Sequence, residues 1–436
     1  MFDLSGALSR GGGAVRGALS LVARRPRFAV NKFVGIARHL GAEYRSSPMH
    51  EANMSEHCLV VGAGLSGAVL ARALAETGVR VTVLEGRDHI GGNCHTERDP
   101  ETGVLVHRYG PHIFHTGVQG VWEYAQRFAR WHPYAHRVRT IAQGQVYALP
   151  LNLHTINQFF GTTHGPDAAR ILLAKQSDQS IRAPQNFEEQ ALHLMGRSLY
   201  DAFFAGYTRK QWGRDPRELP ASILQRLPMR FSYDDRYFDH PYQAMPEGGY
   251  TAMIARILDH PGIELSLGHA ATRADADAFD HVFCTGPLDA WFGHALGRLG
   301  YRTLEFERFT HRGDYQGCAV MNYADPDIPF TRITEHKHFA PWERHEDSVL
   351  FREYSRACGP DDTPYYPIRL VAEKDLLARY VAHAQEEDHV TFLGRLGTYR
   401  YLDMDVCIRE ALDCARAHLA ARKAGMRPPV FSVPPL

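Results

Sequence analysis

A glycine-rich turn between a short apolar run and a helix-forming stretch constrains the fold of this 436-residue chain more than any other feature. Residues 57–61 (HCLVV) form the apolar run, and residues 62–67 (GAGLSG) follow it at once. Residues 68–76 favour a helix, and residues 79–84 favour a second strand. The order strand, GxGxxG turn, helix, strand is the context in which this motif binds a dinucleotide.

The glycines and the acid of this signature each have a physical role. Gly62 permits the tight turn, Gly64 lets the backbone approach a pyrophosphate, and Gly67 lets the helix pack closely on the strand. Glu85 ends the second strand, where a carboxylate can accept hydrogen bonds from the ribose hydroxyls of an adenosine. The sequence therefore predicts a Rossmann-like nucleotide site.

A second glycine pair follows shortly after the acid. The pair is Gly91–Gly92; Arg87 precedes it and Asn93 follows it directly. FAD-binding proteins place such a pair beside the flavin and its phosphates, whereas simple nicotinamide dehydrogenases lack it. A plain Gly-Gly turn is the alternative. We predict FAD as the cofactor, with these four residues in its site.

Composition excludes several other classes of protein. The chain has 49 Lys and Arg against 49 Asp and Glu, which disfavours a nucleic-acid binder with a basic surface. No apolar run approaches the roughly 18 residues of a membrane-spanning helix. The seven cysteines are scattered without a CxxC pair, which is typical of a reducing compartment and predicts a cytoplasmic protein. We predict no metal site, because the histidines near residue 112 match no zinc spacing.

The first 53 residues differ from the rest of the chain. Residues 1–53 carry eight Lys or Arg and three acids, and they include a run of three glycines. We expect an amino-terminal extension that is disordered or that reflects a wrongly assigned start, with Met54 as the initiator. A targeting segment or membrane-surface helix is the minority interpretation.

Eight longer motifs follow in a fixed order, and together they resemble the bacterial branch of the UDP-galactopyranose mutase family. The resemblance covers about residues 56–415. The motifs are residues 108–116 (RYGPHIFHT), 206–213 (GYTRKQWG), 224–231 (LQRLPMRF), 235–238 (DRYF), 246–250 (PEGGY), 331–339 (TRITEHKHF), 364–367 (PYYP) and 394–404 (GRLGTYRYLDM).

The resemblance implies an isomerase that interconverts UDP-galactopyranose and UDP-galactofuranose by ring contraction. In the family the N5 atom of reduced FAD is the covalent nucleophile at the anomeric carbon, and no net oxidation occurs. Bacterial members are usually homodimers, so the resemblance also implies a homodimer.

The resemblance further assigns substrate-binding roles. Arg226 and Arg332 match the two arginines that clamp the diphosphate, a task suited to a permanently charged bidentate group, and we count both as catalytic. Arg226 lies in a predicted mobile lid near residues 219–229. Tyr207 would stack on uracil and Trp212 would line the nucleotide pocket, although both aromatics could instead be core residues. The tyrosines that would hydrogen-bond the diphosphate are Tyr237, Tyr366 and Tyr401.

On the cofactor side, the resemblance places His112 against the flavin, where it could tune the ring or orient the sugar, and we count it as catalytic as well as cofactor-binding. Arg395 would neutralise the reduced flavin at N1. Asp403 and Met404 would contact the diphosphate or ribityl part of FAD.

The predicted fold class is α/β, with a discontinuous Rossmann-like FAD-binding domain, an inserted helical domain and a mixed or antiparallel sheet on the substrate side. The FAD domain would comprise residues 54–131, 243–304 and 356–420. The mostly helical insertion would span residues 132–215, although the block around 140–150 is rich in β-forming residues and predicts strands of the substrate-side sheet. The substrate-side sheet would comprise residues 216–242 and 305–355.

Three alternatives remain open from the sequence. An FAD-dependent oxidoreductase of the amine-oxidase or desaturase type shares the glycine motifs but does not explain the arginine clamp. A mutase for a related sugar nucleotide, such as UDP-N-acetylgalactosamine, would keep the mechanism and change the pocket. A catalytically inactive flavoprotein that acts as a scaffold is the third.

Overall fold

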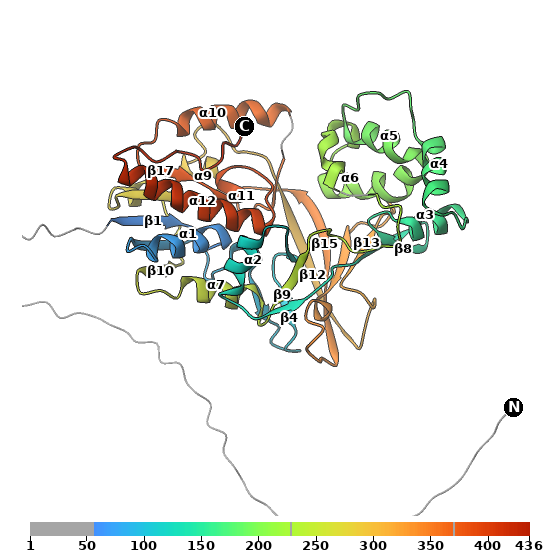
Figure 1. The fold of residues 1–436 in the computed structure, drawn as a ribbon, viewed down its shortest axis with the longest axis horizontal. Coiled ribbons are helices and arrows are strands. Elements are labelled where there is room, and N and C mark those ends of the chain that lie inside the picture. Colours follow the sequence, from blue (N-terminus) through green and yellow to red (C-terminus); the bar gives the residue numbers. More distant parts are fainter. Residues whose placement is uncertain (1–55, 227–228, 369–370) are drawn as a thin grey trace, which may run out of the picture. The chain divides into compact units, whose positions relative to one another are not determined.

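A five-stranded parallel sheet organises the first part of the fold (Figure 1). The computed structural model describes residues 56–226, 229–368 and 371–436, and only the backbone of residues 225–226 and 371–372. The predicted extension, residues 1–53, therefore lies outside the described residues. The strand order is β10-β2-β1-β11-β17. The bounds are β1 His57–Val61, β2 Arg80–Glu85, β10 Ile263–Leu267, β11 His281–Cys284 and β17 Val390–Phe392.

Helices cover both faces of this sheet, which is why β1, β2, β11 and β17 are mostly buried, whereas the edge strand β10 is largely exposed. One face packs against α1 (Leu65–Ala75), α7 (Gly249–Leu258) and α12 (Met404–Lys423) through a shared apolar core. The other face packs against α9 (Leu288–Trp291) and α10 (Val371–Ala384). Strands from three distant parts of the sequence thus form one sheet, as the predicted discontinuous Rossmann-like domain requires.

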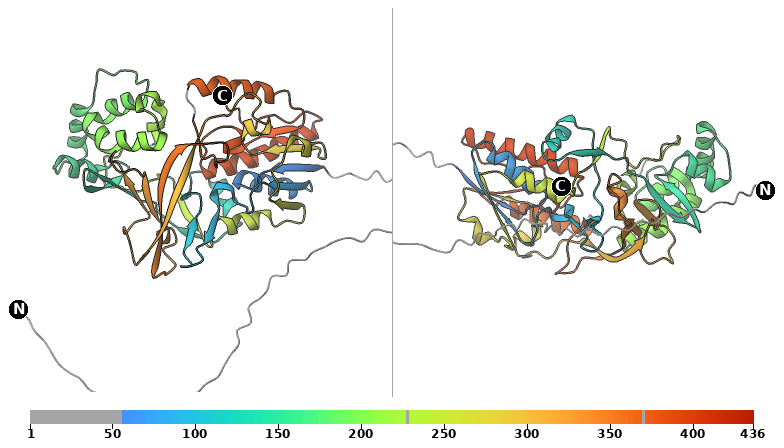
Figure 2. Two further views of the ribbon diagram at one scale, coloured as in Figure 1. Left: turned by 180° about the vertical axis from the view of Figure 1, so that it is seen from behind. Right: turned by 90° about the horizontal axis from the view of Figure 1, so that it is seen from below.

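A seven-stranded mixed sheet forms the second part, with the order β16-β12-β15-β14-β13-β7-β8. Only the β13–β7 pair is parallel among these described strands. The bounds are β7 Val138–Ala142, β8 Gln145–Leu149, β12 Tyr301–Arg312, β13 Val320–Tyr323, β14 Arg332–Glu335, β15 Asp347–Ala357 and β16 Tyr366–Pro367. The long β12 and β15 strands run between the parallel sheet and the helical insertion (Figures 1 and 2).

The helical insertion packs around its own apolar core, which includes Tyr147, Leu199 and Phe203. Its helices are α3 Leu153–Phe160, α4 Pro166–Gln176, α5 Phe187–Tyr200 and α6 Gly206–Trp212, with a π-helical turn over Asp201–Ala205. The side chain of Asn186 caps α5 by accepting from the Glu189 N–H at 2.9 Å. The strands predicted near residues 140–150 are β7 and β8, and they belong to the mixed sheet as expected. The predicted start of the helical insertion at residue 132 is too early, because its helices begin at Leu153.

The prediction that residues 216–242 belong to the substrate-side sheet is also wrong. Pro216–Glu218 and Ala221–Arg226 are short 3-10 helices, and the described part of this block makes only an isolated bridge from Arg236 to that sheet's β7 side. Aromatic residues suggested a strand here, but Asp234 accepts from the Arg236 N–H at 3.1 Å and turns the chain instead. Conversely, β16 lies in the block assigned to the FAD domain, yet it pairs with β12.

Smaller elements connect the two sheets. A three-stranded sheet joins β5 Phe114–Thr116, β9 Tyr242–Pro246 and β6 Trp131–Pro133, and a two-stranded sheet joins β3 Thr96–Arg98 and β4 Leu105–His107. The other helices of the described residues are α2 Gln119–Gln126, α8 Arg273–Ala276 and α11 Gly394–Gly397, together with short 3-10 helices at Gly92–Cys94 and His336–Phe339. The predicted fold class is confirmed, although several of the predicted boundaries are not.

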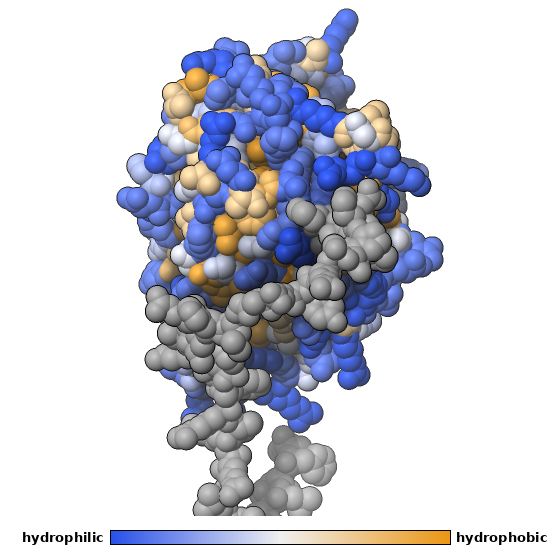
Figure 3. Space-filling model, turned by 90° about the vertical axis from the view of Figure 1, so that its left-hand side faces the viewer, coloured by the Kyte–Doolittle hydropathy of each residue, from blue (hydrophilic) through white to orange (hydrophobic). Residues whose placement is uncertain are grey.

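The surface around the β1, β10 and β17 side of the molecule is mainly hydrophilic, with a few hydrophobic residues gathered near the middle of that view (Figure 3). Within the described residues, none of the helices is both long enough and apolar enough to span a bilayer.

Candidate active site

The GxGxxG turn has the close packing that a dinucleotide site requires. Gly62 has a φ of +102°, and a Cβ there would lie 2.4 Å from Thr285 Oγ1. A Cβ on Gly67 would lie 2.0 Å from the carbonyl oxygen of Gly62, so only glycine lets α1 cross the turn this closely. Glu85 Oε2 accepts from the Ala63 N–H at 2.8 Å, which holds this carboxylate beside the turn.

The second glycine pair lies directly against the first turn. Gly64 and Gly91 form a backbone bridge, and a Cβ on Gly92 would lie 3.1 Å from the Cα of Gly64. In contrast, a Cβ on Gly64 would meet no protein atom closer than 3.8 Å. The space beside Gly64 is therefore open to a ligand, and two glycine-rich turns line it with backbone.

Arg87 supplies positive charge at the same place. Its Nη2 donates to Asn93 Oδ1 at 2.9 Å, and its guanidinium lies over the ring of Tyr109, 4.5 Å from the centroid. Its Nη1 is buried and has no hydrogen-bond partner among the described residues. A buried cationic donor without a partner fits an anionic group such as a phosphate.

A second cluster of polar side chains lies on the mixed sheet. Arg332 begins β14, and its Nη2 donates to the hydroxyl of Tyr207 on α6 at 2.9 Å. Its Nε lies 3.1 Å from the Oε1 of Glu353, a carboxylate that is buried in β15. Burial raises the pKa of Tyr207, although the nearby Arg332 charge opposes this rise. Arg332 is thus held from two sides in a defined orientation.

The sequence did not single out Glu353 or Asn322. The strand register pairs Arg332 with Asn322 on β13 and with Glu353 on β15, so the three side chains share one face of the sheet. Asn322 Oδ1 is buried and has no hydrogen-bond partner among the described residues. Only the pairing of distant strands reveals this row of polar groups.

Aromatic stacking connects the sheet to the cofactor side. The rings of Tyr366 and Tyr401 stack with centroids 5.8 Å apart. The guanidinium of Arg395 lies over the Tyr401 ring at 4.7 Å, while its Nη2 donates to the Leu402 carbonyl at 2.7 Å. Burial raises the pKa of Tyr366, and the Glu353 charge adds to the rise. The predicted pair of tyrosines and Arg395 therefore lie together.

Tyr237 and His112 lie near this group. Burial raises the pKa of Tyr237 to about 12, with a further contribution from Tyr207. Burial and then the charge of Arg395 lower the pKa of His112 to about 4, so its imidazole is neutral at neutral pH. The Nδ1 of His112 lies 3.0 Å from the Gly110 carbonyl, which can only accept, so Nε2 is the unprotonated nitrogen.

The remaining predicted residues are placed as follows. Trp212 ends α6 and is half-buried against the helical core. Asp403 is the N-cap residue of α12, its side chain makes no capping hydrogen bond, and Met404 is the buried first residue of that helix. The side chain of Arg226 lies outside the described residues, so its predicted place in the clamp stays a prediction.

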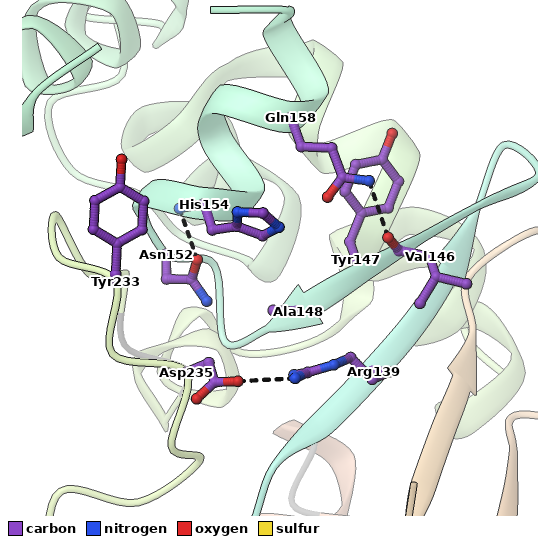
Figure 4. A pocket seen from close by; sticks show the side chains of 9 residues that line it. All are labelled: Arg139, Val146, Tyr147, Ala148, Asn152, His154, Gln158, Tyr233 and Asp235. Atoms are coloured by element: carbon purple, nitrogen blue, oxygen red, sulfur yellow. Dashed lines mark hydrogen bonds and ion pairs between the residues drawn. The ribbon is translucent and has the colours of Figure 1, made fainter. Parts of the chain in front are cut away.

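A separate pocket of about 310 Å³ opens between β7, β8 and the start of α3 (Figure 4). Across it Arg139 pairs with Asp235 at 2.9 Å, and Asn152 accepts from the His154 N–H. None of the predicted site residues is among the residues that line it. The convergence of Arg332 with the tyrosines, rather than this pocket, marks the candidate active site.

Comparisons with known proteins identify the family of the chain. The profile of the UDP-galactopyranose mutase family matches residues 202–401, and the profile of the NAD(P)-binding Rossmann-like domain matches residues 60–128. A probable UDP-galactopyranose mutase from Klebsiella pneumoniae is 56% identical over 380 residues, which cover 87% of this chain and 99% of the relative. The chain belongs to the UDP-galactopyranose mutase family.

Two further comparisons, one with a sequence and one with a solved structure, extend the description of this mutase family member. A dTDP-fucopyranose mutase from Escherichia coli is 50% identical over 372 residues, which cover 84% of this chain and 99% of the relative. A crystal structure of a reduced UDP-galactopyranose mutase superimposes with a TM-score of 0.68 at 16% identity, covering 87% of this chain and 99% of that one. The second likeness concerns the fold alone.

Membership of the mutase family confirms the main interpretation of the sequence, an isomerase built on a Rossmann-like flavoprotein fold. The roles of individual residues remain predictions. The structure brings together Tyr207, Arg332, Tyr366, Tyr401 and Arg395, through contacts that run from α6 to α11. It adds Asn322 and Glu353 to this set.

Proposed function

We propose that this enzyme interconverts UDP-galactopyranose and UDP-galactofuranose. The observation that carries the proposal is the fixed guanidinium of Arg332, held between Tyr207 and Glu353 on a sheet face that also carries Asn322. A bidentate cation of this kind suits a diphosphate that gains negative charge as the bond to the sugar breaks.

The cofactor we propose is FAD, and the residues present fit it. The turn from Gly62 to Gly67 lies against the pair Gly91–Gly92, a Cβ at Gly64 would meet no protein atom closer than 3.8 Å, and the unpaired Nη1 of Arg87 suits a phosphate. Glu85 would hold the ribose, and Arg395 with Asp403 would lie toward the flavin and its ribityl chain. When bound in its reduced form, FAD supplies the nucleophile for the anomeric carbon of the sugar.

The protein side chains then have mainly positioning and electrostatic tasks. Arg332 and Arg226 would hold the diphosphate before and after it leaves the sugar, so that it can return to the same carbon. Tyr207 would stack on uracil, while its hydroxyl accepts from Arg332 and so links base binding to phosphate binding. Tyr237, Tyr366 and Tyr401 would donate to the diphosphate. Burial raises the pKa of Tyr237 and of Tyr366, which keeps these two hydroxyls protonated at neutral pH.

His112 would act as a neutral hydrogen-bonding group near the sugar. Its Nδ1–H is committed to Gly110, so its Nε2 can accept from a sugar hydroxyl. A charged imidazole beside Arg395 would be unfavourable, and the lowered pKa agrees with this. The predicted lid near residues 219–229 would exclude water; Leu219 and Leu224 are buried in the helical core and anchor its described part.

The test is chromatography of UDP-galactofuranose after incubation with the purified protein, with and without dithionite. We expect conversion to UDP-galactopyranose only when the flavin is reduced. Absence of conversion in both states, with FAD bound, would contradict the proposal.

A second candidate substrate follows from the 50% identity to a dTDP-fucopyranose mutase. It would keep the same clamp and cofactor but bind a thymidine nucleotide and a 6-deoxy sugar. The same assay with dTDP-fucofuranose separates the two proposals, because the better substrate has the higher kcat/KM.

We also propose that the enzyme is a cytoplasmic homodimer. The seven cysteines are all free thiols in the described structure, which suits a reducing compartment. Multi-angle light scattering of the FAD-loaded protein tests the dimer, since a single monomer mass at micromolar concentration would contradict it.

A further inference from the structure

Lys210 is surrounded by backbone carbonyl oxygens of a single loop. Its Nζ lies 2.7 Å from the carbonyl oxygen of Tyr323, 2.9 Å from that of Asp325, 3.0 Å from that of Ile328 and 3.1 Å from that of Phe330. An ammonium carries three protons and accepts nothing. The four carbonyl oxygens therefore share the three N–H donors of one ammonium, and the loop backbone is arranged around this single group.

The position of Lys210 gives this arrangement a consequence for the site. Lys210 lies on α6, three residues after Tyr207 and two before Trp212. The loop that it binds joins β13 to β14, and β14 begins with Arg332. One side chain thus connects the helix that carries the uracil-binding residues to the loop that leads into the phosphate-binding arginine.

Close backbone packing between α6 and the β13–β14 loop fixes the distance between them. A Cβ on Gly206, the first residue of α6, would lie 2.4 Å from the carbonyl oxygen of Ala324. The helix therefore rests directly on the loop, with no side chain between them. Without the ammonium, the four carbonyls would lose their shared donor, and the loop would lose the group that keeps it closed.

We propose that Lys210 is a positioning residue that fixes Tyr207 relative to Arg332 and so sets the affinity for the uridine diphosphate part of the substrate. It does not touch the substrate itself. The inference rests on the proposed function, since it assumes that these two residues bind opposite ends of that group. It goes further in assigning a role to a lysine that lies behind the site.

The experiment measures UDP binding to the FAD-loaded protein by calorimetry, for the wild type, Lys210→Met and Lys210→Ala. We expect the dissociation constant for UDP to rise about tenfold or more in both variants, as the loss of hydrogen bonds to a charged group implies. Flavin content should not change, because the glycine turns lie elsewhere. Lys175→Met, at an exposed lysine of α4 in the same helical insertion, should bind UDP like the wild type.

Chemical rescue separates positioning from general stability. Propylammonium replaces the atoms that Lys210→Ala removes, and 1-propanol has a similar shape without the charge. We expect propylammonium to restore UDP affinity to Lys210→Ala, and 1-propanol not to do so. Wild-type affinity in both Lys210 variants would overturn the proposal, and so would equal rescue by the alcohol.

Failure of the Lys210 inference and failure of the proposed function give different experimental results. If the wild type binds UDP but does not isomerise UDP-galactofuranose, the proposed substrate is wrong while the comparison of UDP affinities still decides the role of Lys210. If Lys210→Ala does not fold, Lys210→Met keeps most of the apolar stem and provides the same comparison.

Discussion

The hydroxyl of Tyr207 accepts a hydrogen bond of 2.9 Å from the Nη2 of Arg332, although the two residues lie 125 positions apart in the sequence. Tyr207 comes from the helical insertion and Arg332 from the mixed sheet. The bond therefore spans two parts of the fold at the point where we expect the nucleotide to bind. It orients the arginine before any substrate arrives, which lowers the cost of ordering the clamp on binding.

Replacement of Arg332 by alanine should lower kcat/KM for UDP-galactofuranose by roughly 100-fold or more, because the diphosphate loses a preoriented charge in the transition state. FAD content should not change. The measurement is steady-state kinetics of the dithionite-reduced enzyme. Arg332→Lys should recover only part of the loss, since a lysine has no planar fork with which to bind the diphosphate in a bidentate manner.

The matched control for this variant is Arg352→Ala. Arg352 lies on the neighbouring strand β15, where it pairs with Glu307 at 2.7 Å and points to the opposite face from Glu353. Its loss should leave kcat/KM close to the wild-type value. A similar loss in both variants would indicate a general effect on the sheet and would count against the clamp.

Replacement of Tyr207 by phenylalanine keeps the ring and removes the hydroxyl that Arg332 bonds. We expect KM to rise about three- to tenfold with a smaller change in kcat, as the loss of one hydrogen bond to a charged group implies. Tyr354→Phe removes a hydroxyl that bonds Glu307 at 3.1 Å and serves as the control. Unchanged KM in Tyr207→Phe would show that this bond does not orient the arginine for binding.

Replacement of Gly64 by alanine should give a folded protein that binds FAD poorly. Gly64 has an ordinary φ of −73°, and the added Cβ would meet no protein atom closer than 3.8 Å, so the fold should accept it. The methyl group would instead occupy the space proposed for the pyrophosphate. The flavin absorbance of the purified protein, together with its circular dichroism, tests this.

Two other glycine variants sharpen that experiment. Gly67→Ala places its Cβ 2.0 Å from a backbone oxygen and should disturb folding itself. Gly120→Ala, on α2 with open space around it, should change neither folding nor flavin content. Full flavin loading of a folded Gly64→Ala protein would refute the proposed path of the cofactor.

Acid should destabilise this protein before its carboxylates titrate. Burial lowers the pKa of His112 to about 4, and of His136, His281 and His336 to about 3. Below pH 6.5 the unfolded chain binds protons at these histidines while the folded chain does not, so the free energy of unfolding falls as pH falls. Each histidine contributes up to about 1.4 kcal/mol per pH unit between its two pKa values.

Urea denaturation between pH 7.5 and pH 5 measures this slope. His281→Gln should reduce the slope by about one histidine's share, whatever its effect on stability at pH 7.5. The same slope in His281→Gln as in the wild type would show that His281 is not neutral in the fold.

The parts of the fold that the sequence predicted are those encoded by neighbouring residues. The turn from Gly62 to Gly67 carries its strand, its helix and its packing requirement within a few positions. The motif match identified Arg332 and Tyr207 one by one. It could not show that they bond each other, because that contact depends on how α6 packs against the sheet.

The parts that could not be predicted depend on strand pairing or on turn chemistry. Glu353 and Asn322 join the site only because β13, β14 and β15 pair in one register. Residues 216–242 contain the aromatics of a strand, but Asp234 and the prolines decide the local conformation. In the sequence, Arg87 is only one residue of a motif. The structure shows that Tyr109 and Asn93 hold its guanidinium and leave its Nη1 without a hydrogen-bond partner.

The strand order of the parallel sheet has a consequence for synthesis of the chain. β1 lies between β2 and β11, and β17 completes the far edge, while α12 packs on α1. The ribosome must therefore synthesise nearly the whole chain before the elements around the Gly62–Gly67 turn gain their last packing partners, β17 and α12. We expect cofactor loading to follow release of the finished polypeptide, so premature termination late in the message would yield a protein without flavin.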